Sequence, residues 1–460
     1  MKIENGVAKE VRIAYIGGGS RGWAWGLMSD LAQEKSMSGS VSLYDIDKEA
    51  ARHNEIIGNR ILEQHPDASP WQYKAVDSLQ DALCGTDFVV ISILPGTFDE
   101  MESDVHTPEK YGIYQSVGDT VGAGGIIRAL RAIPMFEEIG LAIRQFCPDA
   151  WVINYTNPMT MCIRALYRVF PQIKAFGCCH EVFGTQRILA QALQEYTDIK
   201  TVERDEIKVN VKGINHFTWI DRAYYQSTDL MPIYEAYAKK HYHDERKTAD
   251  EKNWFNRFFQ SSERVKFDLF LRYHCIAAAG DRHLAEFCPN SWYLKDVEKW
   301  NFSLTPVAFR KKELAERLAR SARMVSGEEP FELRETGEEG VKQMKAILGL
   351  GDLVTNVNLP NQGQIPNLPL NAVVETNAVF TSNSVQPVMA GGLSQEVLSL
   401  TYQTVLNQET VVEAALRRDL DMAFSAFIKD PQIDLPVDKA RTLFDEMVYN
   451  TRKYLPGYQL

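Results

Sequence analysis

Short apolar runs alternate with helix-like stretches over the first two hundred residues of the chain. Residues 11–16 form an apolar run that ends in Gly17-Gly18-Gly19-Ser20 and passes into an apolar-periodic stretch over 23–31, which is typical of a strand, a tight turn and a helix. The alternation continues with strands at 41–44, 87–94, 151–154 and 175–178 and with helices at 48–62 and 126–146. Because strands that alternate with helices predict a doubly wound parallel sheet, we expect an α/β fold with an N-terminal Rossmann-like domain over residues 1–200.

A different pattern begins after residue 200. A strand is predicted at 207–211, helices at 232–247 and 253–279, loops at 359–371, a strand at 372–380 and helices from 395 to the end. The sequence contains no internal repeat, low-complexity tract or long linker. It therefore predicts a C-terminal α+β domain over residues 201–460, which packs closely on the first domain and contributes to the substrate and metal sites.

The composition limits the kinds of molecule that this protein is expected to bind. The net charge of -11 argues against a nucleic-acid binder, because affinity for a phosphate backbone depends on clustered Lys and Arg. The first ten residues lack the apolar stretch of a signal peptide, and no run approaches the roughly 20 apolar residues that cross a bilayer. Seven irregularly spaced cysteines fit reduced thiols. We expect a cytoplasmic protein with small-molecule partners and no membrane contact.

The glycine turn after the first predicted strand is a candidate dinucleotide site. Gly17, Gly18, Gly19 and Ser20 open a helix, where a pyrophosphate can accept hydrogen bonds from backbone N–H groups. The full G-x-G-x-x-G spacing is absent, so the context carries more weight than the motif. Asp45 ends the second strand, where an acid accepts from ribose hydroxyls and favours NAD over a 2′-phosphorylated cofactor. The alternative is a glycine turn that serves sheet packing alone.

Polar and metal-binding side chains follow three later predicted strands. Asn154 and Asn157 flank a turn at the end of one strand, Cys179 and His180 follow the next, and His216 ends a Gly-Ile-Asn-His run. Open α/β sheets bind ligands at these carboxyl ends, and a thiolate with an imidazole can hold a divalent metal. Spacing alone leaves two alternatives open, because His216 can make a structural hydrogen bond and Cys179 can be a small buried apolar residue.

Taken together, six motifs resemble those of glycoside hydrolase family 4, the NAD-dependent glycosidases that depart from two-carboxylate hydrolysis. They are IGGGS at 16–20, VGDTVGAGG at 117–125, NYTNPM at 154–159, CHEV at 179–182, GINH at 213–216 and QIPNLP at 364–369. The resemblance covers most of the chain. It implies that Cys179 and His216 bind a divalent cation, usually manganese, and that Asn157 contacts substrate. Asn154, at the start of the same turn, is expected at the cofactor.

The CHEV motif resembles the α-galacturonidase branch of that family, because the 6-phospho-glycosidase branches carry Asp or Asn after the Cys. This resemblance implies a terminal α-galacturonic acid residue of a small uronide as the substrate. By position, His180 is the candidate acid and Asp281 the candidate base, with Tyr273 as the alternative base. The other substrates left open are those of an α-galactosidase or α-glucosidase of the same family.

A uronide carboxylate calls for a cation. The candidates are Arg282 first, then His283, Arg128 and Arg131, although the last two can instead form a solvated helix face. Asp119 is a candidate contact to a substrate hydroxyl, or a cap for the helix that begins near residue 126.

The resemblance also implies a mechanism: transient oxidation at sugar C3 by NAD, loss of the C2 proton, elimination of the glycosidic oxygen, addition of water and return of the hydride. The cofactor is then needed only catalytically. A 2-hydroxy acid dehydrogenase would instead consume NAD, and an NAD-sensing regulator would need neither Asp281 nor metal ligands. The family resemblance further suggests a homo-oligomer, either a dimer or a tetramer.

Overall fold

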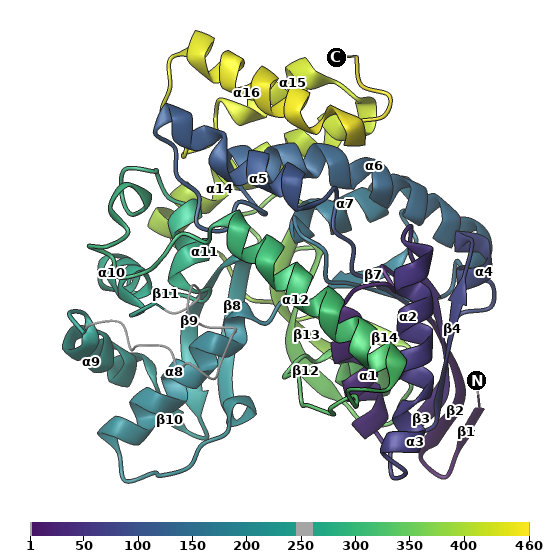
Figure 1. Ribbon diagram of the computed structural model, residues 1–460. Coiled ribbons are helices and arrows are strands. Elements are labelled where there is room, and N and C mark those ends of the chain that lie inside the picture. The colour runs from purple at the N-terminus through teal and green to yellow at the C-terminus, as the bar shows by residue number, and fades with distance from the viewer. Residues whose placement is uncertain (1, 245–260, 460) are drawn as a thin grey trace.

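The computed structural model describes residues 2–244 and 261–459 (Figure 1). Its larger sheet has ten strands in the order β14-β13-β12-β7-β6-β5-β2-β3-β4, with β1 paired to β2. The strands from β4 to β7 run parallel, whereas β12, β13 and β14 are antiparallel additions at one edge. The bounds are β1 (Lys2–Glu4), β2 (Val7–Ile16), β3 (Met37–Tyr44), β4 (Trp71–Val76), β5 (Phe88–Ile91), β6 (Trp151–Asn154), β7 (Lys174–Gly177), β12 (Leu353–Pro360), β13 (Val373–Thr381) and β14 (Ser384–Pro387).

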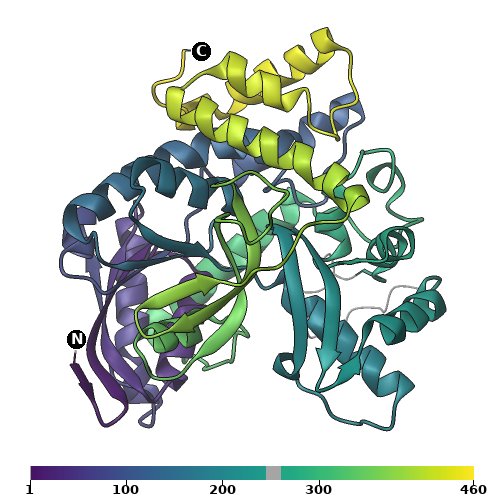
Figure 2. The same ribbon diagram turned by 180° about the vertical axis from the view of Figure 1, so that it is seen from behind.

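A smaller antiparallel sheet lies beside the first and carries part of the site. Its strands are β8 (Ile207–Ile214), β9 (Phe217–Tyr225), β10 (Thr228–Asp229) and β11 (Ile276–Ala277), in the order β10-β9-β11 with β8 also paired to β9. The Asn377 side chain on β13 donates to the carbonyl of Val209 on β8 at 2.7 Å, which ties the two sheets together. Figure 2 shows the two sheets side by side from behind.

Helices cover both faces of the larger sheet. One face packs against α6, α7, α14 and the C-terminal helices, and the other packs against α1, α2 and α13. The bounds are α1 (Trp23–Gln33), α2 (Lys48–Asn59), α3 (Ile61–Gln64), α4 (Leu79–Leu83), α5 (Phe98–His106), α6 (Gly122–Phe146), α7 (Met159–Val169), α8 (Glu181–Tyr196), α9 (Met231–His241), α10 (Arg264–Tyr273), α11 (Asp281–Glu286), α12 (Val307–Ser326), α13 (Gly340–Ile347), α14 (Gln395–Arg417), α15 (Leu420–Phe427) and α16 (Val437–Thr451). Short 3₁₀ turns are η1 (Pro108–Tyr111), η2 (Arg204–Glu206), η3 (Leu294–Asp296) and η4 (Arg452–Tyr454).

The structure confirms the expected fold class and most of the parallel strands. The sheet is nevertheless mixed, because residues 353–387 of the C-terminal half extend the N-terminal sheet. The domain boundary near residue 200 therefore falls between segments that share one sheet, and it stays a prediction. Strand β5 is buried along its whole length, because helices cover both faces of the sheet at this strand. This burial explains the continuous apolar run from which the strand was predicted.

The helix predicted at 253–279 is wrong at its end. Within the described residues the helix ends at Tyr273, because His274 has a φ of +51°, and Ile276 pairs with Ile220 on β9. Residues 253–260 and the end of the predicted helix 232–247 lie outside the described residues. Periodicity does not distinguish a short buried strand from a buried helix turn, which explains the error.

The expectation that Arg128 and Arg131 could form a solvated helix face is also wrong. Both lie on α6, which runs through the interior, and they are 6% and 1% exposed. The Arg131 guanidinium donates to both carboxylate oxygens of Asp104, with Nη1 to Oδ1 at 3.0 Å. This fully buried ion pair fastens α5 to α6 directly before the loop that reaches the site.

We expect Asp104→Ala to lower the free energy of unfolding by roughly 3–5 kcal/mol, because Arg131 would keep its charge in the interior without the carboxylate that balances it. Thermal or urea unfolding measures the loss. Pairing this change with Arg131→Met should restore a large part of it, and Glu10→Ala, which breaks an exposed pair with Lys2, is the control with little effect. Equal losses from Asp104→Ala and Glu10→Ala would contradict the account.

Candidate active site

The glycine turn after β2 forms a cradle with no room for side chains. Gly17 has a φ of +93°, and a Cβ placed there would lie 2.0 Å from the carbonyl oxygen of Ser92. A Cβ on Gly18 would lie 2.8 Å from the Cα of Leu43 on β3. These close approaches require glycine at both positions.

Asp45 and Ser20 lie at this cradle, as the sequence predicted. The Asp45 carboxylate accepts hydrogen bonds from the backbone N–H of Gly19 at 2.8 Å and of Asp47 at 2.9 Å. Burial raises the pKa of this carboxyl. The Asn54 side chain donates to the carbonyl oxygens of Gly18 and Ser20 and so fixes the loop. The glycines, the N-terminus of α1 and an acid at the end of β3 together fit the pyrophosphate and ribose of a dinucleotide.

The turn after β6 holds the two predicted asparagines in different ways. The Asn154 amide is used within the turn, since it donates to the carbonyl of Thr156 and accepts from the same residue's N–H. The Asn157 amide instead reaches out and donates to Asp119 Oδ2 at 3.3 Å. Its Oδ1 is buried without a hydrogen-bond partner among the described residues. Asn157 is therefore the asparagine that faces the site.

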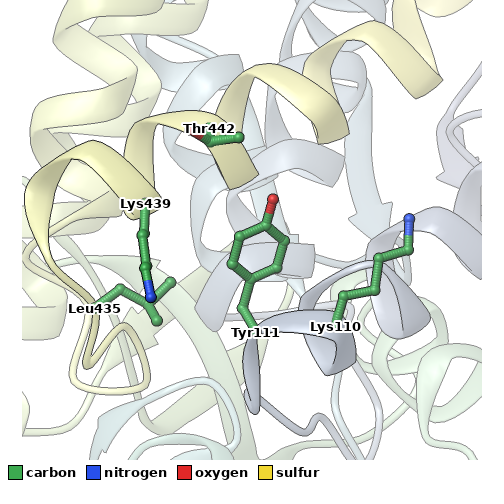
Figure 3. Close-up of a pocket in the computed structure, with 5 residues that line it drawn as sticks. All are labelled: Lys110, Tyr111, Leu435, Lys439 and Thr442. Atoms are coloured by element: carbon green, nitrogen blue, oxygen red, sulfur yellow. The ribbon is translucent and has the colours of Figure 1, made fainter.

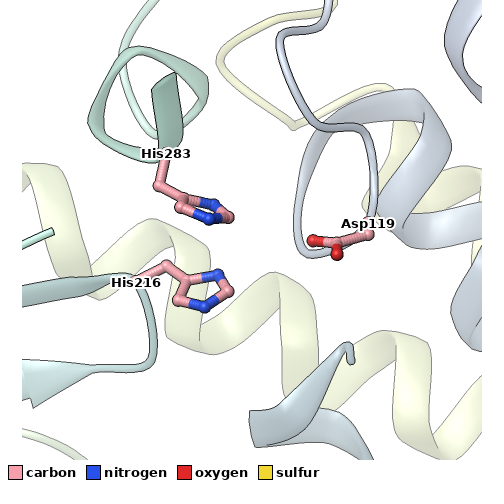
Figure 4. A group of neighbouring side chains, drawn as sticks. All are labelled: Asp119, His216 and His283. Carbon is pink, nitrogen blue, oxygen red and sulfur yellow. The ribbon is translucent and has the colours of Figure 1, made fainter. Parts of the chain in front are cut away.

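Asp119, His216 and His283 bring one metal-binding atom each to within 4.8 Å of one another (Figure 4). They come from the loop before α6, the turn between β8 and β9, and helix α11. The two imidazole rings have their centroids 3.8 Å apart, at an angle of 34°. Asp119 does not cap α6, whose N-cap is Val121 without a side-chain bond.

Hydrogen bonds through Thr120 fix the ring of His216. The Thr120 hydroxyl lies 2.7 Å from Asp119 Oδ1 and 3.0 Å from His216 Nδ1. When the hydroxyl donates to the carboxylate, it accepts from Nδ1–H, and Nε2 is then the ring atom with a lone pair. Such a hydrogen-bonded second nitrogen is typical of a metal-binding histidine.

The charges within the group match a cation site. Burial, followed by the neighbouring His283, lowers the pKa of His216 to about 3, so the imidazole is neutral. Burial opposes ionisation of Asp119, but the neighbouring Arg128 guanidinium is the main opposing charge, and the pKa is lowered to about 2. The Nδ1 of His283 is buried with no hydrogen-bond partner among the described residues. Neutral imidazoles around an ionised carboxylate are a donor set that binds a divalent metal.

Glu181 is the second carboxylate beside these histidines. Its Oε1 lies 3.8 Å from His283 Nε2, and its Oε2 accepts from the N–H of Gly280 at 2.8 Å. Burial opposes its ionisation, but His283, His180 and His216 outweigh it and lower its pKa to about 2. Glu181 is the third residue of the CHEV motif, which indicates the substrate branch in the sequence, and in the structure it lies beside the histidine group.

Cys179 lies next to this group but outside the three residues whose donor atoms converge. It is 8% exposed, and burial, followed by the nearby Glu375 carboxylate, raises the pKa of its thiol well above the usual value. A buried network holds the segment: Asn356 donates to the Cys179 carbonyl at 3.2 Å, and Asn215 donates to Glu375. Asn215 directly precedes His216, so Cys179 and His216 are held by one network.

His180 is the N-cap residue of α8 and carries a carboxylate partner. Its Nδ1 lies 2.9 Å from Glu338 Oε1. Burial acts to lower the pKa of His180, but Glu338 outweighs it and raises the pKa to about 9. The imidazole is therefore protonated near neutral pH, which suits a proton donor. Glu338 lies far from the motifs along the chain, so no local pattern indicated it.

Two family models match the chain, Family 4 glycosyl hydrolase over residues 12–195 and Family 4 glycosyl hydrolase C-terminal domain over residues 211–433. The chain belongs to glycoside hydrolase family 4. The α-galacturonidase of Thermoanaerobacterium saccharolyticum is 61% identical over 100% of both chains. The α-galacturonidase of Bacillus subtilis is 52% identical, over 95% of this chain and 97% of its own. An α-galactosidase of the same organism is 26% identical over 97% of this chain and 100% of its own.

Solved structures show the same family fold. The crystal structure of lplD from Bacillus subtilis has a TM-score of 0.91 at 51% identity and covers 95% of this chain and 100% of its own. A 6-phospho-alpha-glucosidase from gut microorganisms, in complex with NAD and Mn²⁺, has a TM-score of 0.80 at 22% identity, with 98% and 100% covered. The second likeness shows the fold alone.

The structure of this family 4 chain does not bring Asp281, Arg282 and Tyr273 into the three-residue group. Asp281 is 1% exposed, and its Oδ1 accepts from the N–H of Lys266 at the start of α10. Arg282 donates to the Ser116 carbonyl at 2.5 Å and to the Ser303 carbonyl at 3.2 Å. Tyr273 packs edge-on against Trp219. His283 is the member of this segment that enters the group, because residues two apart on a helix point in different directions.

Two cavities lie away from these residues. The larger, of about 400 Å³, lies between η1 and α16 and is lined by Lys110, Tyr111, Leu435, Lys439 and Thr442 (Figure 3). The other, of about 340 Å³, is lined by Asp268, Arg272, Trp292, Tyr293 and Trp300. None of the predicted site residues lines either cavity. Across the described part of the chain, no helix has the length and apolar character needed to span a bilayer.

We expect His216→Ala and His283→Ala each to weaken Mn²⁺ binding by more than about 100-fold, because outer partners alone change metal affinity by 10–100-fold. Calorimetric titration of the metal-free protein measures the affinity. His274→Ala, at an exposed position, is the matched control with unchanged affinity.

Cys179→Ser tests the thiol in the same titration, and the sequence prediction expects weaker binding. Unchanged affinity in Cys179→Ser would remove this residue from the ligand set. Unchanged affinity in both histidine variants would overturn the metal site.

Proposed function

We propose that this chain is an α-galacturonidase that hydrolyses terminal α-galacturonic acid residues of small uronides with catalytic NAD and a divalent cation, of which manganese is the first candidate. The observation that carries the substrate is the full-length identity of 52–61% to α-galacturonidases. The glycine cradle and the Asp119, His216 and His283 group support the cofactors. A cytoplasmic location and a homo-oligomeric state stay predictions.

The two cofactors supply what the side chains lack. Gly17, Gly18, Gly19, Ser20 and Asp45 would hold NAD at the cradle, where it would supply reversible hydride transfer at sugar C3 and so acidify the C2–H bond. A divalent cation, when bound, supplies Lewis acidity toward the sugar oxygens. Asn154 would support the turn beside the proposed dinucleotide contacts. Asp119, His216 and His283 would hold the metal, together with Cys179 as the sequence predicts.

We assign the role of acid to His180 and a substrate contact to Asn157. A protonated imidazole with a pKa of about 9 can give its proton to the departing glycosidic oxygen near neutral pH. The unpartnered Asn157 Oδ1 can accept from a sugar hydroxyl. Asp119, which Asn157 orients, is proposed to bind the metal rather than substrate alone.

The carboxylate of the uronide needs a nearby cation, and Arg282 remains the proposed one. It is buried, and burial followed by the neighbouring Arg310 guanidinium lowers its pKa to about 10. The guanidinium groups of Arg282 and Arg310 lie near each other and form a positively charged region. This region lies beside the carboxylates of Asp119 and Glu181. A carboxylate bound there would relieve the repulsion between the two arginines.

Two carboxylates can take the C2 proton. Asp281 has the matching basicity, because burial and the nearby Glu263 raise its pKa to about 7, and its Oδ2 is unpartnered among the described residues. Glu181 has the closer position to the histidines but the weaker basicity, with a pKa of about 2. We propose Asp281 as the base, with Glu181 as its rival.

The substrate prediction is tested by hydrolysis of p-nitrophenyl α-D-galactopyranosiduronic acid beside the neutral α-galactoside and α-glucoside. We expect nitrophenol from the uronide alone, loss of activity when NAD⁺ or Mn²⁺ is omitted, and no accumulation of NADH. Cleavage of a neutral glycoside would overturn the uronide and keep the family mechanism. Steady growth of NADH on a hydroxy acid would identify a dehydrogenase and overturn the proposal.

The base is tested by comparing Asp281→Asn with Glu181→Gln. We expect Asp281→Asn to lower kcat by about 100- to 10,000-fold and to enlarge the kinetic isotope effect with substrate deuterated at C2, because proton removal becomes slower. Thermal unfolding of both variants controls for misfolding. A normal isotope effect in Asp281→Asn together with an enlarged one in Glu181→Gln would transfer the role to Glu181.

A further inference from the structure

Residues 332–339, here called the crossing segment, connect α12 to α13 and lie along helix α1. The Ser29 hydroxyl on α1 donates to the Arg334 carbonyl at 2.7 Å and accepts from the Arg334 N–H at 2.6 Å. The Thr336 hydroxyl donates to Asp30 on α1 at 2.5 Å. In Figure 1, α12 crosses the front of the molecule and ends near α1 and α2. This part of the C-terminal half therefore lies beside α1, the helix that follows the glycine turn.

The crossing segment ends at the candidate acid. The N–H of Glu338 donates to Thr336 Oγ1 at 3.0 Å, and the Glu338 carboxylate lies 2.9 Å from His180 Nδ1. The next residue, Glu339, accepts from Arg204 Nη2 at 2.6 Å. Glu338 thus lies between Thr336, which is hydrogen-bonded to α1, and Glu339, which is hydrogen-bonded to Arg204. Its side chain is 19% exposed, against 48% for His180.

Among the described residues, the Glu338 carboxylate makes the polar contact that most restrains the orientation of the His180 ring. Trp23, at the start of α1, has its ring centroid 6.5 Å from the His180 ring and 5.3 Å from the Tyr155 ring. These ring contacts limit the space but do not choose which nitrogen faces which way. As the N-cap residue of α8, His180 makes no side-chain capping bond. Its imidazole orientation therefore depends on Glu338.

A histidine acts at one ring nitrogen while a hydrogen bond at the other fixes its rotation and its tautomer. With Nδ1 paired to the Glu338 carboxylate at 2.9 Å, Nε2 is the nitrogen left to meet substrate. Without that acceptor, a half-exposed ring can turn about χ2 and lose the productive geometry. The carboxylate reaches His180 from a segment that lies 158 positions later along the chain.

We propose that Glu338 is a positioning residue, which fixes the His180 ring through Nδ1 and so directs Nε2 to the reacting sugar. The proposal rests on the proposed function, since it takes His180 as the proton donor. The crossing segment thereby has a role in the chemistry. It is hydrogen-bonded to α1 and places one carboxylate beside His180.

The kinetic test compares Glu338→Ala and Glu338→Gln on the uronide. Glu338→Ala should lower kcat by about 10- to 100-fold with a much smaller change in KM, as for carboxylates that orient active-site histidines elsewhere. Glu338→Gln keeps an oxygen that can accept from Nδ1–H and should recover much of that loss. Glu335→Ala, an exposed carboxylate of the same segment, is the matched control with wild-type kinetics.

A double variant separates positioning from simple support of the fold. In the His180→Ala background, Glu338→Ala should cause no further loss of kcat, because its effect passes through the ring. Independent, multiplying losses would overturn the proposal. So would wild-type kcat in Glu338→Ala.

A readout without turnover uses protein labelled with ¹⁵N at its nine histidines. The hydrogen-bonded Nδ1–H signal that disappears in His180→Ala should also disappear in Glu338→Ala and persist in Glu335→Ala. Its persistence in Glu338→Ala would overturn the contact. If the wild-type protein fails to hydrolyse the uronide, the proposed function falls, while this spectrum still decides whether Glu338 fixes the ring.

Discussion

The ionisation of one half-buried carboxylate, Asp119, is the constraint around which this site is organised. A buried carboxylate is costly unless charges and hydrogen bonds compensate for its lost hydration. Arg128 lies on α6 as one compensating charge, Thr120 and Asn157 donate to the two carboxylate oxygens, and two histidines complete the group. Removing the network would leave this half-buried charge without compensation. The same arrangement gives a concentrated negative site for a cation.

Helix α11 supports the position of Asp119 with two of its residues. His283 extends from it into the group, while Glu286, one turn later, accepts from the N–H groups of Val117 and Gly118 at 2.7 and 2.9 Å. The loop that carries Asp119 is thereby fixed to the helix that carries its neighbour. Burial raises the pKa of Glu286 to about 7. A short helix from the C-terminal half thus sets the distance between parts of the site that come from both halves of the chain.

Residues that follow a strand in an unbroken motif could be predicted from the sequence, because the end of a parallel strand places them at one sheet edge. The glycine turn, Asp45 and His216 belong to this class, and the structure places them at the cradle and in the histidine group. From the sequence, His283 is only one of several candidates for the uronide carboxylate, after Arg282, because helix rotation decides which of three neighbouring polar residues faces inward. Glu338 carries no local signal at all, since only the tertiary path of the crossing segment brings it to His180.

The chain is a family 4 glycosidase in sequence and fold, and we propose that it breaks the glycosidic bond through loss of the C2 proton. Hydrolysis of the uronide in D₂O, followed by NMR of the released galacturonic acid, tests this claim most directly. Elimination and readdition predict deuterium at C2 of the product, bound to carbon and stable on return to H₂O. A product with hydrogen fully retained at C2 would contradict the account and indicate direct displacement at C1.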